Sequence, residues 1–209
     1  MTADTDAHVI DDDAAVRDSI EFLLRSARLT VRTYDSAAAF LDALPAIRSG
    51  CIITDVRMPG ISGIDLLRRL KEMRVQLPVI VITGHGDVPL AVEAMKFGAA
   101  DFLEKPFDDE VLLASVRSAL DRSEASAALE TERAEIRARI ATLTHREREV
   151  LDGLIAGHPN KIIAFDLEIS PRTVEIYRAN VMTKMKAGSL SELVRMALAA
   201  GAMKSAPDR

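Results

Sequence analysis

The sequence predicts two parts: an α/β domain built on a doubly wound, five-stranded parallel sheet, and a smaller all-α domain of four helices. Three observations predict this. Short apolar runs alternate with helical patterns over residues 7–122, no strand pattern appears after residue 143, and a helix-forming stretch separates the two parts. Such alternation is typical of βαβ units, in which right-handed crossovers join parallel strands.

Each element of the first part has its own local signal. Strands are expected at residues 7–10, 30–34, 51–54, 79–83 and 101–104. Helices are expected at residues 14–26, 36–44, 63–73, 87–98 and 108–122. Ser36 can cap the second of these helices and Gly98 can end the fourth. We expect the strand order 2-1-3-4-5, with its switch point between the first and third strands.

Residues 123–142 contain no Gly or Pro and are rich in Ala, Glu and Arg, which are good helix formers. Apolar residues recur there at helical spacing, at Leu129, Ile136, Ile140 and Leu143. We therefore predict a helical linker over 123–142, which either continues the fifth helix or stands apart from it. A flexible tether is the alternative.

Four short helices are expected in the second domain, over residues 143–209. Their start signals are the capping box Thr144–Glu147, then Asn160, then Ser170 before Pro171, and finally the capping box Ser189–Glu192. They should end near residues 156, 167, 186 and 200, with Gly188 terminating the third. The second and third, joined by a tight turn, have the form of a helix-turn-helix module.

The composition is that of a soluble globular protein, with 48% hydrophobic and 28% charged residues. The chain has no run of 18 apolar residues and no apolar segment near its acidic N-terminus, so neither a membrane span nor a signal peptide is expected. Its one cysteine, Cys51, cannot form an internal disulfide and should be a small buried hydrophobe. We expect a cytoplasmic protein.

The net charge of −5 is unevenly distributed. Residues 1–122 carry 14 Lys and Arg against 20 Asp and Glu, whereas residues 170–209 carry 7 against 3. The acidic part argues against nucleic acid as its partner, and the basic end permits it. An ordinary solvated surface would also explain an excess of this size.

Polar residues follow four of the predicted strands. They are Asp11 and Asp12, Asp55, Thr83 and Lys105. Because the carboxyl ends of parallel strands share one edge of the sheet, where ligands bind, these side chains should converge. Taken singly, each has a plainer interpretation: a helix cap, a β-forming threonine, a Lys-Pro turn.

Together they suit phosphoryl transfer. Mg²⁺ prefers one or two carboxylates beside phosphate oxygens, and Asp11, Asp12 and Asp55 supply such a set. A carboxylate can also attack phosphorus, and Asp55, on the central strand, is the best nucleophile. Lys105 offers a positive charge and Thr83 a hydroxyl donor for the phosphoryl oxygens.

Four motifs carry a resemblance: Ile10-Asp-Asp-Asp13, Thr54-Asp-Val-Arg-Met-Pro-Gly60, Ile82-Thr-Gly84 and Glu104-Lys-Pro-Phe107. Over about residues 7–122 they resemble the flavodoxin-like receiver domain of bacterial two-component response regulators, and we place that domain at residues 1–122. The resemblance implies that Asp55 accepts phosphate from a sensor histidine kinase. It implies Asp11, Asp12, Asp55 and the carbonyl of Arg57 as Mg²⁺ ligands, Thr83 and Phe102 as a switch pair, Lys105 as the phosphoryl-binding lysine, and a cis Lys105–Pro106 bond.

A second resemblance covers the C-terminal domain. Leu143-Thr-His-Arg-Glu-Arg-Glu-Val-Leu151, Asn160-Lys-Ile-Ile-Ala164 and Ile169-Ser-Pro-Arg-Thr-Val174 resemble the LuxR/FixJ-type helix-turn-helix. With Thr83-Gly-His-Gly-Asp-Val-Pro89 and Arg172–Val181, the whole chain resembles the FixJ-type response regulators. That resemblance implies an oxygen-sensing, FixL-like kinase partner. It also implies that the chain activates nitrogen-fixation and microaerobic genes, with RNA polymerase as a further partner.

The helix that starts at Pro171 is the predicted recognition helix for double-stranded DNA. Arg172, Glu175, Ile176 and Ala179 share one face and should meet base edges, with Thr173 beside them in the motif. Val174, Val181 and Met185 should pack inward. Phosphate contacts are expected from Lys161, Arg178 and Lys184. Glu175 stands where relatives often carry Lys, so it either accepts from a cytosine amino group or holds Arg178.

Phosphorylation should act as a population shift that remodels the fourth helix, the fifth strand and the fifth helix. The family precedent implies a phosphorylation-dependent homodimer through Val92, Met95 and Lys96, on that fourth helix. We therefore interpret the chain as a phosphoacceptor and transcription factor that assists its own phosphorylation and dephosphorylation, rather than as an enzyme. A Mg²⁺-dependent phosphatase and a module whose second half docks protein are the alternatives.

Overall fold

A computed structural model of the 209-residue chain describes residues 6–84 and 88–202. The residues His85 to Asp87 of the motif that runs from Thr83 to Pro89 lie outside the described part. The chain divides into two compact units, Met1–Ala125 and Ser126–Arg209. Our domain boundaries at 122 and 143 remain a prediction, and each unit is described by itself below.

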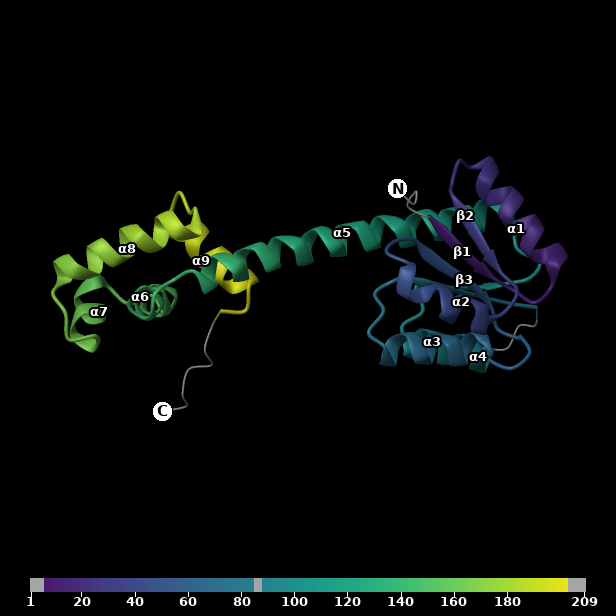
Figure 1. Ribbon diagram of the computed structural model, residues 1–209, viewed down its shortest axis with the longest axis horizontal. Helices are drawn as coiled ribbons and strands as arrows, with labels where there is room; N and C mark the ends of the chain where they lie inside the picture. Colours follow the sequence, from purple (N-terminus) through teal and green to yellow (C-terminus); the bar gives the residue numbers. More distant parts are fainter. Residues whose placement is uncertain (1–5, 85–87, 203–209) are drawn as a thin grey trace. The chain divides into compact units, whose positions relative to one another are not determined.

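The first unit is the predicted doubly wound sheet (Figure 1). Its strands are β1 (Ala7–Ile10), β2 (Val31–Tyr34), β3 (Cys51–Asp55), β4 (Val79–Thr83) and β5 (Asp101–Glu104). All four pairings are parallel and the order is β2-β1-β3-β4-β5, as the sequence predicted. β3 and β4 are buried along their whole length, as central strands covered on both faces should be.

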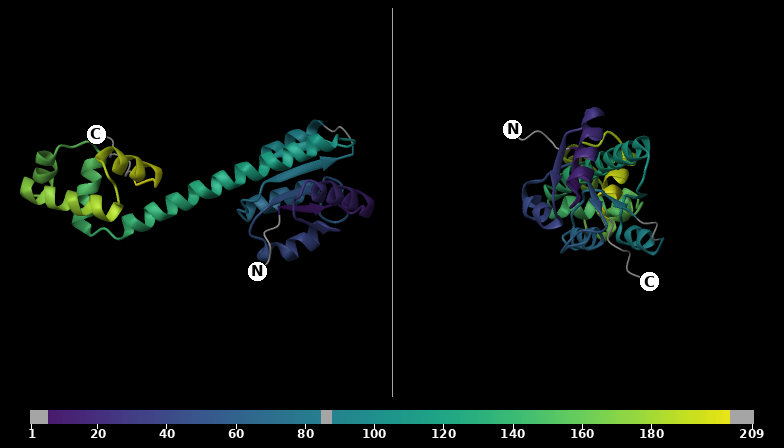
Figure 2. Two further views of the ribbon diagram at one scale, coloured as in Figure 1. Left: turned by 90° about the horizontal axis from the view of Figure 1, so that it is seen from above. Right: turned by 90° about the vertical axis from the view of Figure 1, so that its right-hand side faces the viewer.

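Helices cover both faces of this sheet (Figure 2). They are α1 (Ala14–Ser26), α2 (Ala37–Ala43), α3 (Gly63–Glu72), α4 (Val88–Phe97) and the first part of α5 (Asp109–Ala141), with a short 3-10 turn, η1, at Leu44–Ala46. Side chains of α2, α3 and α4 pack on one face of the sheet, and those of α1 and α5 on the other. Because successive strand residues point to opposite faces, Val81 joins the first core and Ile80 the second.

The caps explain where several helices start and stop. Asp13, Ser36 and Ser62 cap α1, α2 and α3 by accepting a bond from a backbone N–H. Gly98 follows α4 with φ of +96°, a left-handed conformation that glycine adopts without strain. The predicted roles of Ser36 as a helix cap and of Gly98 at a helix end are therefore confirmed.

The predicted linker is helical and continues the fifth helix without a break, so α5 has 33 residues. Ion pairs along its exposed stretch join Glu130 to Arg133 and Arg137, and Glu135 to Arg139. Such pairs support a helix that little else stabilises. Its last turns differ, because Ile136 and Ile140 are buried in the core of the second unit.

The second unit adds four helices to the end of α5: α6 (His145–Ile155), α7 (Asn160–Asp166), α8 (Pro171–Met185) and α9 (Leu190–Ala199). The capping box of Thr144 and Glu147 is present in full. The tight turn between α7 and α8 is made by Glu168, whose φ is 54°. The described helices thus form the predicted helix-turn-helix arrangement.

Three local predictions in this unit were wrong. Asn160 is not a cap, because α7 already begins there and Pro159 precedes it without a side-chain bond. α8 ends at Met185, with Lys186 rather than Gly188 in the left-handed conformation, at φ of 55°. Glu192 completes no full capping box, since its carboxylate accepts from Gly188 N and not from Ser189 N.

Candidate functional site

Asp11, Asp55 and Lys105 meet at the carboxyl edge of the sheet. Ile10 pairs with Thr54, so Asp11 and Asp55 leave neighbouring strands side by side. The Lys105 Nζ then lies 2.7 Å from Asp55 Oδ1 and 2.9 Å from Asp11 Oδ2. Lys105 is 94 positions from Asp11 and 50 positions from Asp55 in the chain, so residues far apart in the sequence form one ionic cluster.

The carboxylates of this cluster are buried, which strengthens their interaction with Lys105. Asp11 and Asp55 are only 3% and 9% exposed. Burial by itself would lower the pKa of the Lys105 ammonium, but hydrogen bonds to Asp55 and Asp11 and the attraction of both carboxylates outweigh it and raise that pKa. Lys105 is therefore charged at neutral pH and offsets part of the repulsion between the two carboxylates.

The backbone around Asp55 fixes its direction. The N–H of Arg57 donates to Asp55 Oδ2 at 2.6 Å, while Lys105 holds the other oxygen. The start of α3 packs directly on this strand end, and a Cβ at Gly63 would lie 2.1 Å from the Asp55 carbonyl oxygen. A side chain at position 63 would therefore force α3 and the end of β3 to move apart. Sequence reasoning missed Gly63, although a glycine at the first position of a helix was a usable signal.

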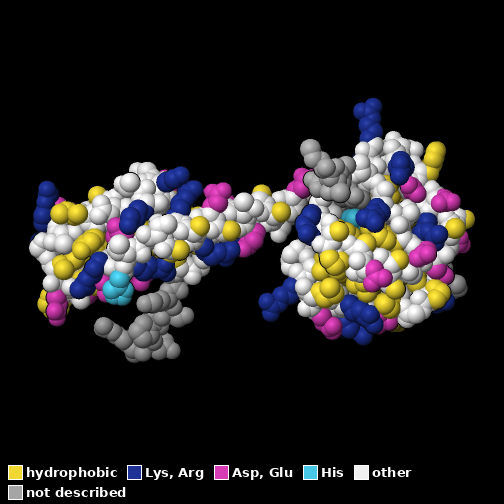
Figure 3. All heavy atoms as spheres, in the orientation of Figure 1, with side chains coloured by type: hydrophobic (Ala, Val, Ile, Leu, Met, Phe, Trp, Pro, Cys, Tyr) yellow, Lys and Arg dark blue, Asp and Glu magenta, His cyan; other side chains and the backbone are white. Residues whose placement is uncertain are grey.

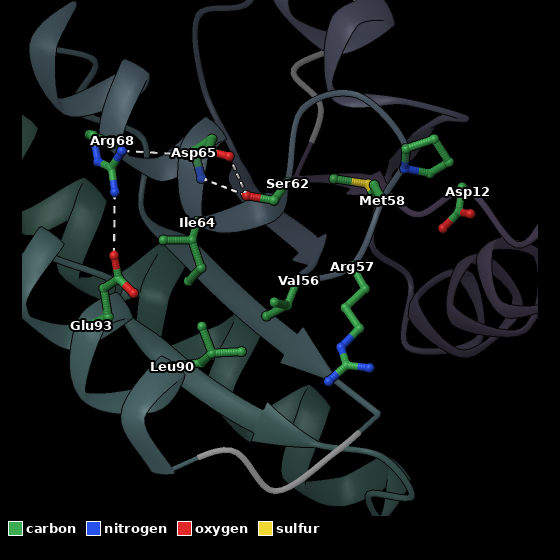
Figure 4. A pocket seen from close by; sticks show the side chains of 11 residues that line it. Asp12, Val56, Arg57, Met58, Ser62, Ile64, Asp65, Arg68, Leu90 and Glu93 are labelled. Carbon is green, nitrogen blue, oxygen red and sulfur yellow. Dashed lines mark hydrogen bonds and ion pairs between the residues drawn. The ribbon is translucent and has the colours of Figure 1, made fainter.

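Asp12 stands apart from the ionic cluster. Its side chain is exposed, next to the loop that carries Arg57 and Met58, and it lines a hollow of about 670 Å³ beside the site (Figure 4). Among residues 6–84 and 88–202, no three His, Cys, Asp or Glu side chains are gathered as a ready-made metal cluster.

The donor chemistry nevertheless suits Mg²⁺, because that ion takes only one or two carboxylates and fills its remaining positions with water and phosphate oxygens. Asp11 and Asp55 are two such carboxylates at one edge of the sheet, with Asp12 following Asp11 directly.

Thr83 and Phe102 lie on the same face of the sheet. Thr83 pairs with Glu104 and Val81 pairs with Phe102 across β4 and β5, so both side chains point toward the layer that contains α4. Thr83 is fully buried and Phe102 is partly buried against that core. The Lys105–Pro106 bond that follows is cis, as the resemblance implied.

On α4, the predicted dimer residues face outward. Val92 and Met95 are 48% and 53% exposed, and Lys96 is exposed beside them. Ala94, between them in sequence, is fully buried against the sheet. The outer face of α4 therefore combines apolar and basic groups that have no partner within the hydrophobic core of this unit.

The predicted recognition helix α8 divides as expected between core and surface. Val174, Val181 and Met185 are fully buried. Arg172, Glu175, Ile176 and Ala179 are exposed, and Thr173 lies partly buried in the cap, where its hydroxyl is 2.8 Å from that of Ser170.

Two of the predicted DNA-contact residues have ionic partners within the unit. Glu175 pairs with Arg172, at 3.0 Å, and not with Arg178, although both arginines lie three residues from it on the helix. Lys184 lies 2.6 Å from the buried carboxylate of Glu147 and also donates to the Thr142 carbonyl. Its charge is therefore paired inside the unit, and the phosphate contact of Lys184 stays a prediction.

Lys161 and Arg178 remain available at the surface. They line a shared hollow of about 550 Å³ between α7, α8 and the start of α9. Figure 3 shows Lys and Arg side chains spread over the visible face of this unit, with hydrophobic side chains among them where α7 and α8 meet. Exposed apolar residues on these two helices are Ile162, Phe165 and Ile176.

Both halves match known families. Residues 7–117 match the response regulator receiver domain, and residues 141–197 match the luxR family of bacterial regulatory proteins. The chain therefore belongs to the response regulators that join a receiver domain to a luxR-type DNA-binding domain.

Within that class it is of the FixJ type. It is 64% identical over 194 residues to the transcriptional regulatory protein FixJ of Azorhizobium caulinodans, covering 93% of this chain and 92% of the relative. It is 58% identical over 201 residues to FixJ of Bradyrhizobium diazoefficiens, covering 96% and 98%.

Solved structures agree with this assignment. Full-length FixJ from B. japonicum matches with 57% identity and a TM-score of 0.60, covering 97% of this chain and 100% of that one. The response regulator StyR matches with 38% identity and a TM-score of 0.82, covering 94% and 99%. Among the described residues, no helix is long and apolar enough to cross a bilayer.

Proposed function

We propose that Asp55 is the phosphoacceptor and receives its phosphoryl group from a sensor histidine kinase. The observation that carries this proposal is the contact of one ammonium, on Lys105, with both Asp55 and Asp11 at the ligand-binding edge of the sheet. One Asp55 oxygen attacks the phosphorus of a phosphohistidine. A P–O bond forms, the P–N bond breaks, and the electron pair leaves with the imidazole.

Lys105 can remain bonded to the site when the phosphoryl group adds negative charge at Asp55. As the Asp55 oxygen becomes phosphorylated, the ammonium can bond a phosphoryl oxygen while it keeps Asp11 as a partner. Asp11, Asp12, Asp55 and the Arg57 carbonyl would hold Mg²⁺, which supplies positive charge for the phosphoryl oxygens. The exposure of Asp12 at the mouth of the site supports this assignment, because a hydrated ion must enter from solvent.

The phosphoryl group then acts on α4 through the sheet. The Thr83 hydroxyl turns toward it, and Phe102, on the same face, moves into the space that Thr83 leaves. The outer face of α4, with Val92, Met95 and Lys96, pairs with that of a second copy. A dimer of this kind brings two recognition helices to a two-fold DNA site.

On DNA, Arg172 and Ile176 meet base edges, Glu175 orients Arg172, Thr173 lies at the entry of the helix, and Lys161 and Arg178 bind phosphates. The regulated genes are those of nitrogen fixation and microaerobic growth, the kinase is FixL-like and senses oxygen, and the bound dimer contacts RNA polymerase in the cytoplasm. The identity to FixJ proteins over nearly the whole chain supports this assignment.

Phosphorylation is tested on the full chain with acetyl phosphate and Mg²⁺. Intact mass should show one added phosphoryl group, and sedimentation should show a dimer that is absent without the donor. Asp55→Asn should show neither. The scheme is wrong if Asp55→Asn dimerises to the same extent with and without the donor.

DNA recognition is tested by selecting binding sites from a random duplex pool with the phosphorylated chain. Binding should weaken steeply with salt, because Lys and Arg displace counterions from phosphates. Arg172→Ala should relax the selected sequence, whereas Lys161→Ala should weaken all duplexes alike and lower the salt slope. Failure to bind any duplex in a salt-dependent way would point instead to a module that docks protein.

A further inference from the structure

Two helices of the receiver unit are joined by one arginine. Arg68 on α3 lies 3.4 Å from Asp65 of its own helix and 3.3 Å from Glu93 of α4. Figure 4 shows Arg68 and Glu93 pointing toward one another from neighbouring helices at the rim of the hollow. The pair therefore spans the boundary between α3, which follows the phosphoacceptor strand, and α4, which carries the outer face proposed for dimerisation.

The same guanidinium also stacks on α4. Its Cζ lies 4.9 Å from the centre of the Phe97 ring, a distance at which a cation is attracted to the face of an aromatic ring. One turn along α3, the Lys71 ammonium lies 5.8 Å from the same ring and donates to the carbonyl of Lys96. Cations are favoured at the C-terminal end of a helix, so both contacts hold the last turns of α4.

α4 has three sides with different surroundings, and the contacts of Arg68 and Lys71 lie on the side that faces α3. Glu93 and Phe97 turn to α3, Ala94 turns to the sheet, and Val92 and Met95 turn outward. The hollow beside Arg68 reaches the loop of Arg57 and Met58, directly after Asp55. A shift of α4 driven from Asp55 would therefore have to stretch or break the contacts of Arg68.

We propose that Arg68, with Glu93 and Phe97, is a latch that holds α4 in its resting position and sets how readily the unphosphorylated chain dimerises. This inference rests on the proposed function, in which phosphorylation displaces α4. Arg68 is a positioning residue, whose charged and aromatic contacts among the described residues are with Asp65, Glu93 and Phe97. Because the latch is made only in the resting state, removing it should favour the displaced state without adding any contact to it.

The first test compares Arg68→Ala with wild type by sedimentation, with and without acetyl phosphate. Without the donor, the variant should dimerise at a roughly fivefold lower concentration, a modest factor because exposed ion pairs and cation–π contacts are each weak. With the donor, the two should be equal. Arg68→Lys keeps the charge toward Glu93 but loses the planar stack, and should fall between them.

Arg25→Ala is the matched control. It removes an exposed ion pair, Arg25 to Glu21 at 2.7 Å, within α1 on the other face of the sheet. This variant should dimerise as wild type does. An Arg68→Ala variant that leaves the unphosphorylated equilibrium unchanged, or that shifts both states equally, overturns the latch.

A second measurement is independent of phosphorylation and dimerisation. Amide hydrogen exchange across α4 of the unphosphorylated monomer should be about three- to fivefold faster in Arg68→Ala than in Arg25→Ala, with the β3 and β4 amides unchanged. Equal exchange in α4 overturns the latch even if the chain never dimerises. If wild type is not phosphorylated while α4 exchange does rise, the proposed function fails and the latch stands as a contact that holds α4.

Discussion

Lys184, near the end of α8, binds Glu147 at the start of α6, with its Nζ 2.6 Å from Oε2. Glu147 is 4% exposed and also accepts from the Thr144 N–H at 2.7 Å, so one carboxylate closes a helix cap and an ion pair. On the same side, Arg139 of α5 donates to the Met185 carbonyl. The end of the predicted recognition helix is thereby joined to α6 and to the last turns of α5.

Replacing Lys184 with Ala should destabilise the second unit. The change leaves the buried Glu147 carboxylate without its cation, so the free energy of unfolding should fall by about 2 kcal/mol. This loss is smaller than for a fully buried ion pair, because the Lys184 side chain is 36% exposed. Urea unfolding measures this. Lys161→Ala, an exposed lysine in the same unit, serves as control and should leave stability unchanged. A Lys184→Ala variant as stable as the control would contradict the role of this pair.

The same pair predicts an acid-sensitive step. The hydrogen bond from Lys184, and then that from the Thr144 backbone, lower the pKa of Glu147 below its ordinary value of 4.5. The stabilisation is therefore present above pH 4.5 and is lost as pH falls through the lower, folded-state pKa. Unfolding measured between neutral pH and pH 3 should show this slope in wild type and a shallower one in Glu147→Gln. Identical slopes would exclude Glu147 as the group responsible.

At the phosphoacceptor strand, Gly63→Ala should distort the site. The added Cβ would meet the Asp55 carbonyl oxygen at 2.1 Å, and overpacking of this kind costs roughly 1–3 kcal/mol. The free energy of unfolding and the rate at which acetyl phosphate labels Asp55 should both fall. Gly84→Ala is the control for stability, because no atom of the described residues lies within 4 Å of a Cβ there. Equal stability of the two variants would show that α3 can move away from Asp55 freely.

The single cysteine should be chemically inert in the folded chain. Cys51 is fully buried in β3, and burial raises the pKa of its thiol to about 12. The reactive thiolate is therefore scarce at neutral pH. Iodoacetamide should label the native protein far more slowly than the urea-unfolded chain, as followed by intact mass. Rapid labelling of the native protein would mean that β3 opens readily.

The sequence was most informative where a local rule suffices. The five strands, the polar residues after them and the caps at Ser36 and Thr144 each follow from a pattern within a few residues. The convergence of Asp11, Asp55 and Lys105 followed from topology alone, because parallel strands end at a common edge.

Contacts between distant elements were out of reach. Lys184 looked like a surface cation until α6 placed Glu147 beside it, and Arg68 gave no sign of its partners on α4. The steric role of Gly63 depends on how closely α3 approaches β3, which no single-sequence pattern reports. Arg172 lies three residues before Glu175 and Arg178 three residues after it, so spacing alone could not decide which arginine pairs with Glu175.

The burial of Ile136 and Ile140 bears on how the DNA-binding half can be isolated. A fragment that starts at residue 143 would discard two side chains of the core, together with Arg139, and would expose part of the apolar cluster that they complete. Truncations meant for crystallography or binding assays should begin upstream of residue 136. A shorter piece that aggregates or binds poorly would then report a damaged core rather than a missing receiver.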